Sequence, residues 1–181
     1  MARSSDRYIE HLLRRAGFGA RPDELDFYGG RTLNLDKQTD LKLQVLVTVF
    51  PDNHTPGPSF DFVQGGASLI RREGPLTVTV LGTYVPDGSY ASKQVWRAEV
   101  AADYALTKAL TLKSLAGHTW IENGRSRSYW SLAAAARWRW VGFEVRYQDT
   151  NLSRRQCGFN PDICGAAVSG LLTADFPLIL F

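Results

Sequence analysis

The feature that most constrains the fold is an alternation of apolar and polar residues with a period of two. From residue 25 onward, apolar side chains occupy every second position in long runs. Successive side chains on a β-strand point to opposite faces, so each run predicts a strand with one apolar and one polar face. We expect nine strands, at about 25–34, 40–50, 60–71, 75–85, 93–106, 109–120, 128–139, 143–150 and 165–176.

The length of these runs separates two classes of β protein. Strands of soluble proteins usually have about five or six residues, whereas a tilted strand needs about 9–11 to cross the hydrocarbon layer. The connections also alternate between short turns, at 72–75, 107–108 and 140–142, and longer polar segments. Because outer-membrane barrels have short turns at one rim and long loops at the other, the sequence predicts such a barrel over 25–181, antiparallel, up-and-down and of about eight to ten strands. The longer segments are 51–59, 86–92, 121–127 and 151–164.

Aromatic residues are placed on the apolar face as in a barrel that crosses lipid. Trp96 and Tyr104 share one strand face eight positions apart, and Trp130 and Trp138 repeat this spacing. Eight steps of about 3.3 Å span roughly 26 Å, close to the height of an apolar band flanked by aromatic girdles. Mostly small residues lie between them, whereas a sealed core more often uses large aliphatic ones. The expected lipid-facing girdle is Trp96, Tyr104, Trp130, Trp138 and Trp140.

The opposite face carries charged side chains of both signs. In a barrel these side chains would line a water-filled lumen and form ion pairs there. Their mixed sign argues against strong selectivity for one type of ion. The expected lumen-lining residues are Lys42, Arg97, Glu99, Asp103, Arg137, Arg139, Glu144 and Arg146.

Motifs for catalysis or cofactor binding are absent from the sequence. It has no nucleophile elbow, no phosphate-binding glycine loop and no pair of histidines with ligand spacing. We therefore expect no enzymatic activity, no cofactor and no metal site. A net charge of +3 is too small to argue for nucleic-acid binding, and the aromatic and charged side chains lie on opposite strand faces.

The two cysteines, Cys157 and Cys164, lie in the same predicted loop. Two cysteines at this spacing do not make a zinc site, which needs four ligands in closer pairs. A disulfide is favoured over free thiols, and it would place the chain in an oxidising compartment.

Parts of the chain resemble a known family. Residues 24–30 read Glu-Leu-Asp-Phe-Tyr-Gly-Gly, and residues 143–152 precede the paired cysteines and a last strand ending in Phe176. In order and spacing these segments are similar to the TorF-type outer-membrane porins over about residues 24–176. The resemblance implies a pore-forming barrel in the bacterial outer membrane, with the lipid bilayer and the barrel-assembly machinery as partners. It also implies that a C-terminal aromatic residue, Phe176 or Phe181, is the assembly signal.

The N-terminal segment 1–24 departs from this family. Residues 5–16 have the period of a short helix, and residues 6–22 resemble the start of an unrelated, uncharacterised bacterial family. No secretory signal is visible. Counting back from the last strand puts the start of the first one at the long-loop rim, although bacterial barrels have both termini at the short-turn rim. We therefore expect a truncated or fused barrel whose first strand, 25–34, closes poorly or not at all onto 165–176.

Two alternatives remain open. In a soluble lipocalin-like barrel that binds an apolar ligand, the apolar face would turn inward, so that Trp96 and Tyr104 would be buried and their charged neighbours exposed. In an adhesion or interaction module, the loops 51–59 and 151–164 would contact a partner.

Overall fold

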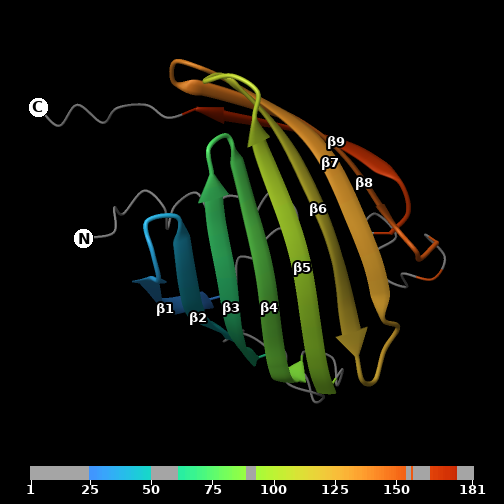
Figure 1. The fold of residues 1–181 in the computed structure, drawn as a ribbon. Coiled ribbons are helices and arrows are strands. Elements are labelled where there is room, and N and C mark those ends of the chain that lie inside the picture. The colour runs from blue at the N-terminus through green and yellow to red at the C-terminus, as the bar shows by residue number, and fades with distance from the viewer. Residues whose placement is uncertain (1–24, 50–60, 89–92, 154–155, 157–163, 175–181) are drawn as a thin grey trace, which may run out of the picture.

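The computed structural model describes residues 25–49, 61–88, 93–153, 156 and 164–174. Within these ranges the chain forms nine β-strands, which Figure 1 shows side by side in sequence order. They are β1 (Leu25–Asn34), β2 (Thr39–Val49), β3 (Phe62–Glu73), β4 (Leu76–Gly88), β5 (Lys93–Ala105), β6 (Leu110–Ile121), β7 (Arg127–Trp138), β8 (Val141–Thr150) and β9 (Ala167–Ala174). The predicted strands are confirmed, and the largest difference is at the end of β4, predicted at residue 85 and found at Gly88. The helix predicted within 1–24 lies outside the described residues.

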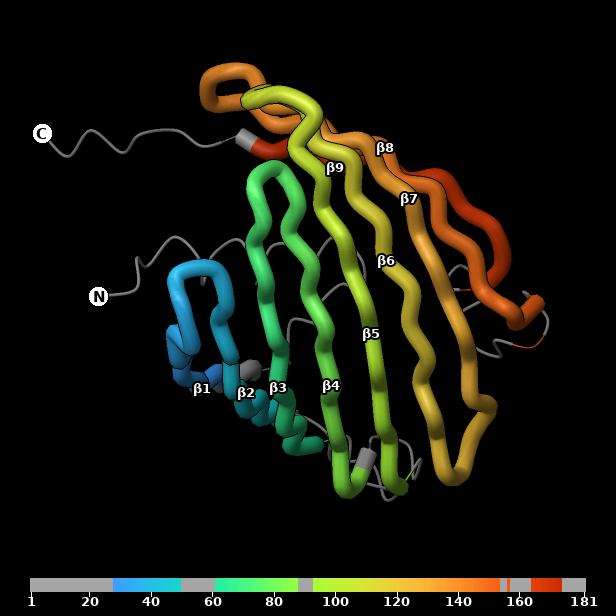
Figure 2. Tube along the Cα trace, in the orientation of Figure 1, coloured from blue at the N-terminus to red at the C-terminus, as the bar shows by residue number. Residues whose placement is uncertain are grey.

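All nine strands belong to one sheet, in which each strand pairs antiparallel with the next one along the chain. Figure 2 shows the chain running up and down across a strongly curved layer. The ladders are regular except where β4 meets β5, between Val85 and Gly88. The predicted all-β, antiparallel, up-and-down architecture is therefore confirmed. Gly65 and Gly66, in the middle of β3, stay in the regular ladder and form no bulge.

The first and last strands, β1 and β9, form the two edges of the sheet. In the part of the chain that the structure describes, no ladder joins them. Because the strand number is odd and neighbours are antiparallel, β1 and β9 run in the same direction, so a direct pairing would be parallel. The expectation that 25–34 forms an edge not closed onto the last strand holds for the described residues.

Connections of two kinds alternate between the two ends of the sheet. The short-turn rim holds 35–38, 74–75, 106–109 and 139–140. The strand ends at the other rim, the long-loop rim, are separated in sequence by 50–61, 89–92, 122–126 and 151–166, which are only partly described. The predicted alternation is thus present except at 89–92, which has four residues like 35–38 and 106–109 because β4 extends to Gly88. The segment 122–126 is shorter than the expected loop 121–127 because β6 and β7 extend into it. The turn expected at 140–142 is also shorter, because cross-strand pairing begins at Val141.

The tight turns at the short-turn rim follow from local chemistry. Gly74 has φ +56°, a conformation that glycine adopts without steric cost, whereas Arg139 adopts φ +53° despite its side chain. In the turn 35–38, the carboxylate of Asp36 accepts a hydrogen bond of 2.7 Å from the backbone N–H of Gln38. This bond is the largest of the influences that hold the pKa of Asp36 below its usual value.

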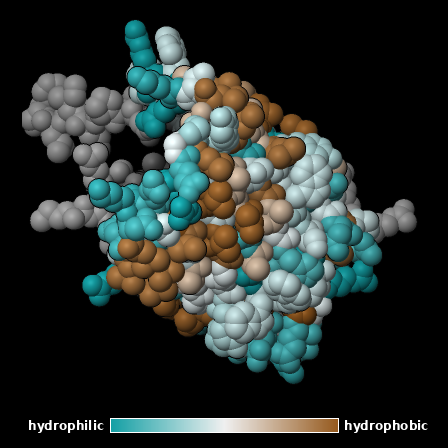
Figure 3. Space-filling view, in the orientation of Figure 1, coloured by the Kyte–Doolittle hydropathy of each residue, from teal (hydrophilic) through white to brown (hydrophobic). Residues whose placement is uncertain are grey.

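The two faces of the sheet differ in exposure and polarity. On β5, Trp96 and Tyr104 are 52% and 46% exposed, whereas the side chain of Glu99 is only 17% exposed. We name the face of Trp96 the outer face and the face of Glu99 the inner face. Residues paired in register lie on the same face, so the register assigns the residues of the other strands to one face or the other. Figure 3 looks onto one side, where hydrophobic side chains gather over the strands and hydrophilic ones lie toward the strand ends. Among the described residues, the buried apolar side chains are few: Leu46, Val85, Ala133 and Cys164.

Candidate functional site

The inner face holds most of the charged residues that the sequence analysis singled out. The register places seven of them there: Lys42, Arg97, Glu99, Asp103, Arg137, Glu144 and Arg146. Arg139 differs from the expectation, because it lies in the turn 139–140 rather than on a strand face. Its guanidinium carbon lies 5.3 Å from the centre of the Trp138 ring, a cation–π contact at the short-turn rim.

Glu144 is the centre of one charge cluster on the inner face. Its Oε2 accepts a hydrogen bond of 2.8 Å from Nζ of Lys113, and its Oε1 accepts bonds of 2.7 and 3.1 Å from Nη2 and Nε of Arg146. Lys113 lies on β6 and Glu144 on β8, so the lysine side chain crosses β7. It can do so because β7 carries the small residues Ala133 and Ala135 at these positions. With only 11% of its side chain exposed, Glu144 is held by two cations.

In a second cluster a side chain also reaches across a neighbouring strand, here across β6. The hydroxyl of Tyr129, on β7, donates a hydrogen bond to Oε1 of Glu99, on β5, and its ring lies over Gly117 of β6. A Cβ atom at Gly117 would lie 2.6 Å from the Tyr129 ring, so only glycine allows this crossing. The Oε1 of Glu99 also lies 3.8 Å from Nη1 of Arg97.

Lys113 and Tyr129 take part in these inner-face clusters, and the guanidinium carbon of Arg127 lies 5.9 Å from the centre of the Tyr129 ring; none of the three is among the predicted lumen-lining residues. Lys113 and Tyr129 lie at polar-face positions of their predicted strands, so the alternation could have found them, whereas Arg127 lies in the predicted loop 121–127, one residue before the predicted strand 128–139. Their partners could not be found in this way, because the contacts depend on which residues of neighbouring strands lie in register. Among the described residues, neither Lys42 nor Asp103 forms a hydrogen bond or ion pair with these two clusters, although Asp103 pairs in register with Lys113.

The outer face carries a row of aromatic side chains near the long-loop rim. The rings of Tyr84 and Trp96 stack with their centres 4.1 Å apart, and Trp96 pairs in register with Trp120. Further along the sheet, Trp130 lies 5.3 Å from Tyr147 between ring centres. Trp96 and Trp130 belong to the expected girdle, whereas Tyr84, Trp120 and Tyr147 do not. They lie at apolar-face positions, so the same alternation assigns them to the outer face.

Tyr104, Trp138 and Trp140 lie at the opposite end of their segments, toward the short-turn rim. Their exposed fractions are 46%, 73% and 47%. Trp140 is part of the turn 139–140 rather than of a strand. Aromatic side chains therefore occur near both ends of the strands on the outer face.

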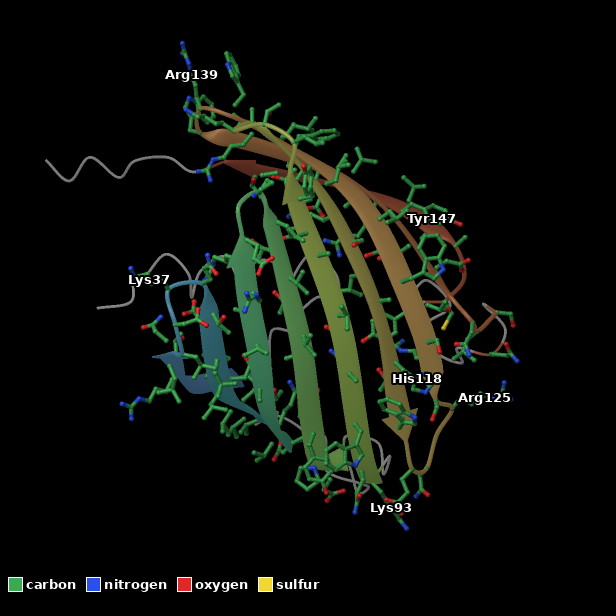
Figure 4. All side chains as sticks on the ribbon, in the orientation of Figure 1. Lys37, Lys93, His118, Arg125, Arg139 and Tyr147 are labelled. Carbon is green, nitrogen blue, oxygen red and sulfur yellow. The ribbon has the colours of Figure 1, made fainter. Side chains whose placement is uncertain are left out.

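Between these aromatic ends the outer face is free of charge over the middle of the sheet. On β4, β5, β6 and β7 the outer-face positions of the regular ladder hold no Asp, Glu, Lys or Arg. The charged outer-face residues of the other described strands all lie within the last four residues of their strands: Arg31, Arg71, Glu73 and Asp149. Figure 4 shows labelled cations at the ends of the strands, with Lys37 and Arg139 at one end and Lys93 and Arg125 at the other.

The remaining predicted sites lie partly beyond the described residues. Cys164 is 2% exposed and is not a free thiol, whereas Cys157 is outside the described ranges, so the disulfide stays a prediction. Phe176 and Phe181 are outside them as well. Among the described side chains, no group of three or more His, Cys, Asp or Glu is placed to hold a metal ion. Over the same ranges, no helix is long and apolar enough to cross a membrane.

Comparison with known proteins adds no family to this description. No protein-family model matches the chain, and no curated protein matches its sequence.

Proposed function

We propose that this chain forms the wall of a transmembrane β-barrel in the bacterial outer membrane, through which small polar solutes or ions pass without energy input. The observation that carries the proposal is the contrast between the faces. The outer face is apolar and charge-free between aromatic ends, while the inner face holds the charge clusters of Glu99 and Glu144. This is the arrangement that lipid outside and water inside require.

Exposure of apolar side chains favours lipid over water as the outer surroundings. Val100, Leu132 and Phe143 are each more than half exposed, and Val168 and Leu172 are 72% exposed. Soluble monomers rarely expose contiguous apolar patches larger than a few hundred Å². A lipocalin-like barrel would bury the apolar face of β5, so the observed orientation weighs against that alternative. No feature of the described residues favours an adhesion module, whose expected contact loops lie mostly outside them.

A barrel in lipid needs partners for both edges of the sheet. Unpaired backbone N–H and C=O groups are not tolerated within the hydrocarbon layer. Because β1 and β9 run in the same direction, one further strand running opposite to both would close the sheet with antiparallel ladders only. We therefore include at least one additional strand in the proposal. Hydrogen exchange in lipid tests it, since protected amides along β1 require a partner strand there.

Passage through such a barrel would be narrow. In a barrel of about ten strands the interior is largely filled by side chains. The side chains of Lys113 and Tyr129, which cross neighbouring strands, occupy part of this space. The polar inner face lowers the free energy of a hydrated ion relative to the hydrocarbon, while the filled cross-section limits passage to water and small ions. The resemblance to the TorF-type porins agrees with this proposal.

The experiment is reconstitution of the full chain into lipid vesicles and planar bilayers. We expect folded protein that requires detergent or lipid, migrates faster on a gel before heating than after it, and gives ion conductance. Protein added after irreversible heat unfolding is the control and should give none. A fully water-soluble monomer without affinity for vesicles would overturn the membrane proposal, and membrane-inserted protein without conductance would overturn the pore.

Recognition of the chain by the barrel-assembly machinery is tested separately, in a bacterial host. If a C-terminal aromatic residue is recognised by the barrel-assembly machinery, F176A or F181A should lower the yield of folded protein in the outer membrane of a bacterial host. The yield after spontaneous folding in vesicles should not change, because no machinery is present there. Equal yields of both variants and the parent chain in the host would remove this part of the proposal.

A further inference from the structure

We propose that the inner face near the long-loop rim holds a binding site for a small oxyanion, formed by Arg97, Thr119 and Arg127. These residues lie in one row across β5, β6 and β7. Arg97 pairs in register with Thr119, and Thr119 pairs in register with Arg127. The backbones of β5 and β7 are about 10 Å apart, twice the spacing between neighbouring strands. Two long side chains can therefore converge from both sides above the threonine.

Unsatisfied polar groups mark the middle of this row. Thr119 is only 3% exposed, and its hydroxyl Oγ1 has no hydrogen-bond partner among the described residues. The Nε of Arg127 is likewise buried without a partner within them. Buried polar groups are normally hydrogen-bonded, and each one left unpaired costs free energy. An oxyanion placed between them would accept hydrogen bonds from both groups.

The charges around the row are positive and only partly neutralised. Among the described residues, no carboxylate lies within ion-pair distance of Arg127, whose guanidinium carbon lies 5.9 Å from the centre of the Tyr129 ring. Arg97 has Glu99 at 3.8 Å, but the same Oε1 of Glu99 accepts the hydrogen bond from Tyr129. The charge of Arg97 acts on Arg127 as well. An anion bound between Arg97 and Arg127 would offset the repulsion between their charges.

The chemistry of these groups fits a tetrahedral or planar oxyanion such as phosphate, sulfate or a carboxylate. Guanidinium groups present parallel N–H donors that match two oxygens of such an anion, and a threonine hydroxyl supplies a further donor. Chloride would receive the same charge but could not use the paired geometry. The site therefore prefers an oxyanion to a halide, which total lumen charge alone would not achieve.

The site deepens the proposed function, because it assigns an anionic group to the solute, but binding does not require conductance. The test is calorimetric titration of inorganic phosphate into the folded full chain in detergent micelles at low ionic strength. We expect saturable binding that R127Q weakens at least tenfold and T119V weakens severalfold. R127K keeps the positive charge but loses the parallel N–H donors of the guanidinium group. Its phosphate affinity should therefore lie between those of the parent chain and R127Q. R125Q is the matched control, since Arg125 is exposed in the connection 122–126 and its loss removes the same charge.

Different results would overturn the proposed oxyanion site and the proposed pore. Heat-modifiable migration on a gel confirms that each variant is folded before titration. No saturable phosphate binding to the parent chain, an equal loss in R125Q and R127Q, or chloride binding as tight as phosphate binding would each overturn the site. Phosphate binding in a chain that gives no conductance would retain the site and overturn the pore, and conductance without phosphate binding would do the reverse.

Discussion

Val100 offers the sharpest test of which face of the sheet meets lipid. It lies on the outer face of β5, 51% exposed, four residues from Trp96 and four from Tyr104. Four steps of about 3.3 Å make roughly 13 Å along the strand, and a tilt of about 40° reduces this to roughly 10 Å of height. Both aromatic residues then lie near the borders of an apolar band about 25 Å tall, with Val100 at its middle.

An arginine at this position should therefore be costly in lipid. V100R is expected to destabilise the folded protein by about 2–4 kcal/mol, the cost of a cation at the midplane on the lipid face of a barrel. The matched control is Q94R, on the same face and strand but beyond Trp96, roughly 15 Å of height from the midplane. There the cost falls to about 0–1 kcal/mol. The two variants should differ by about 1–4 kcal/mol, and a difference of about 2 kcal/mol is roughly 30-fold in the folding equilibrium constant.

The assay is reversible urea unfolding in short-chain phosphatidylcholine vesicles, followed by the fluorescence of the five tryptophans. The free energies of unfolding of V100R, Q94R and the parent chain are compared at equal lipid concentration. If V100R and Q94R both stay within about 0.5 kcal/mol of the parent, as surface changes in water usually do, the outer face does not meet lipid.

Three further predictions concern the inner face, a turn and the cysteines. G117A should destabilise the sheet by about 1–3 kcal/mol through overpacking against Tyr129, and Y129A should relieve most of this cost in the double variant, as measured by denaturant unfolding. The carboxyl carbon shift of Asp36, followed by NMR, should titrate below the usual pH range. The contribution of this group to stability is present above its unfolded pKa and lost as the pH falls through its lower folded pKa, so D36N should remove that pH dependence. C164S should prevent a shift between reduced and non-reduced gels and, if the disulfide to Cys157 is present, cost about 2–4 kcal/mol; identical migration of the parent chain under both conditions would contradict the pairing.

The alternation of residue types was sufficient to locate all nine strands and to assign their faces, because the period of two is a property of each strand alone. It placed Trp96 and Trp130 on the outer face and Arg97 and Glu144 on the inner one before any partner strand was known. Predicted boundaries at turns were less accurate. Val141 continues a ladder that no local pattern reveals, since pairing depends on the neighbouring strand.

Contacts across the sheet were decided only by the tertiary structure. The hydrogen bond from Tyr129 to Glu99 joins strands two apart and requires a glycine, Gly117, in the register position between them. The row of Arg97, Thr119 and Arg127 likewise exists only because three separate strands align. A strand's own sequence determines which way its side chains point, but which side chains meet depends on register and on the space left by the strand between, and neither is encoded in any one segment.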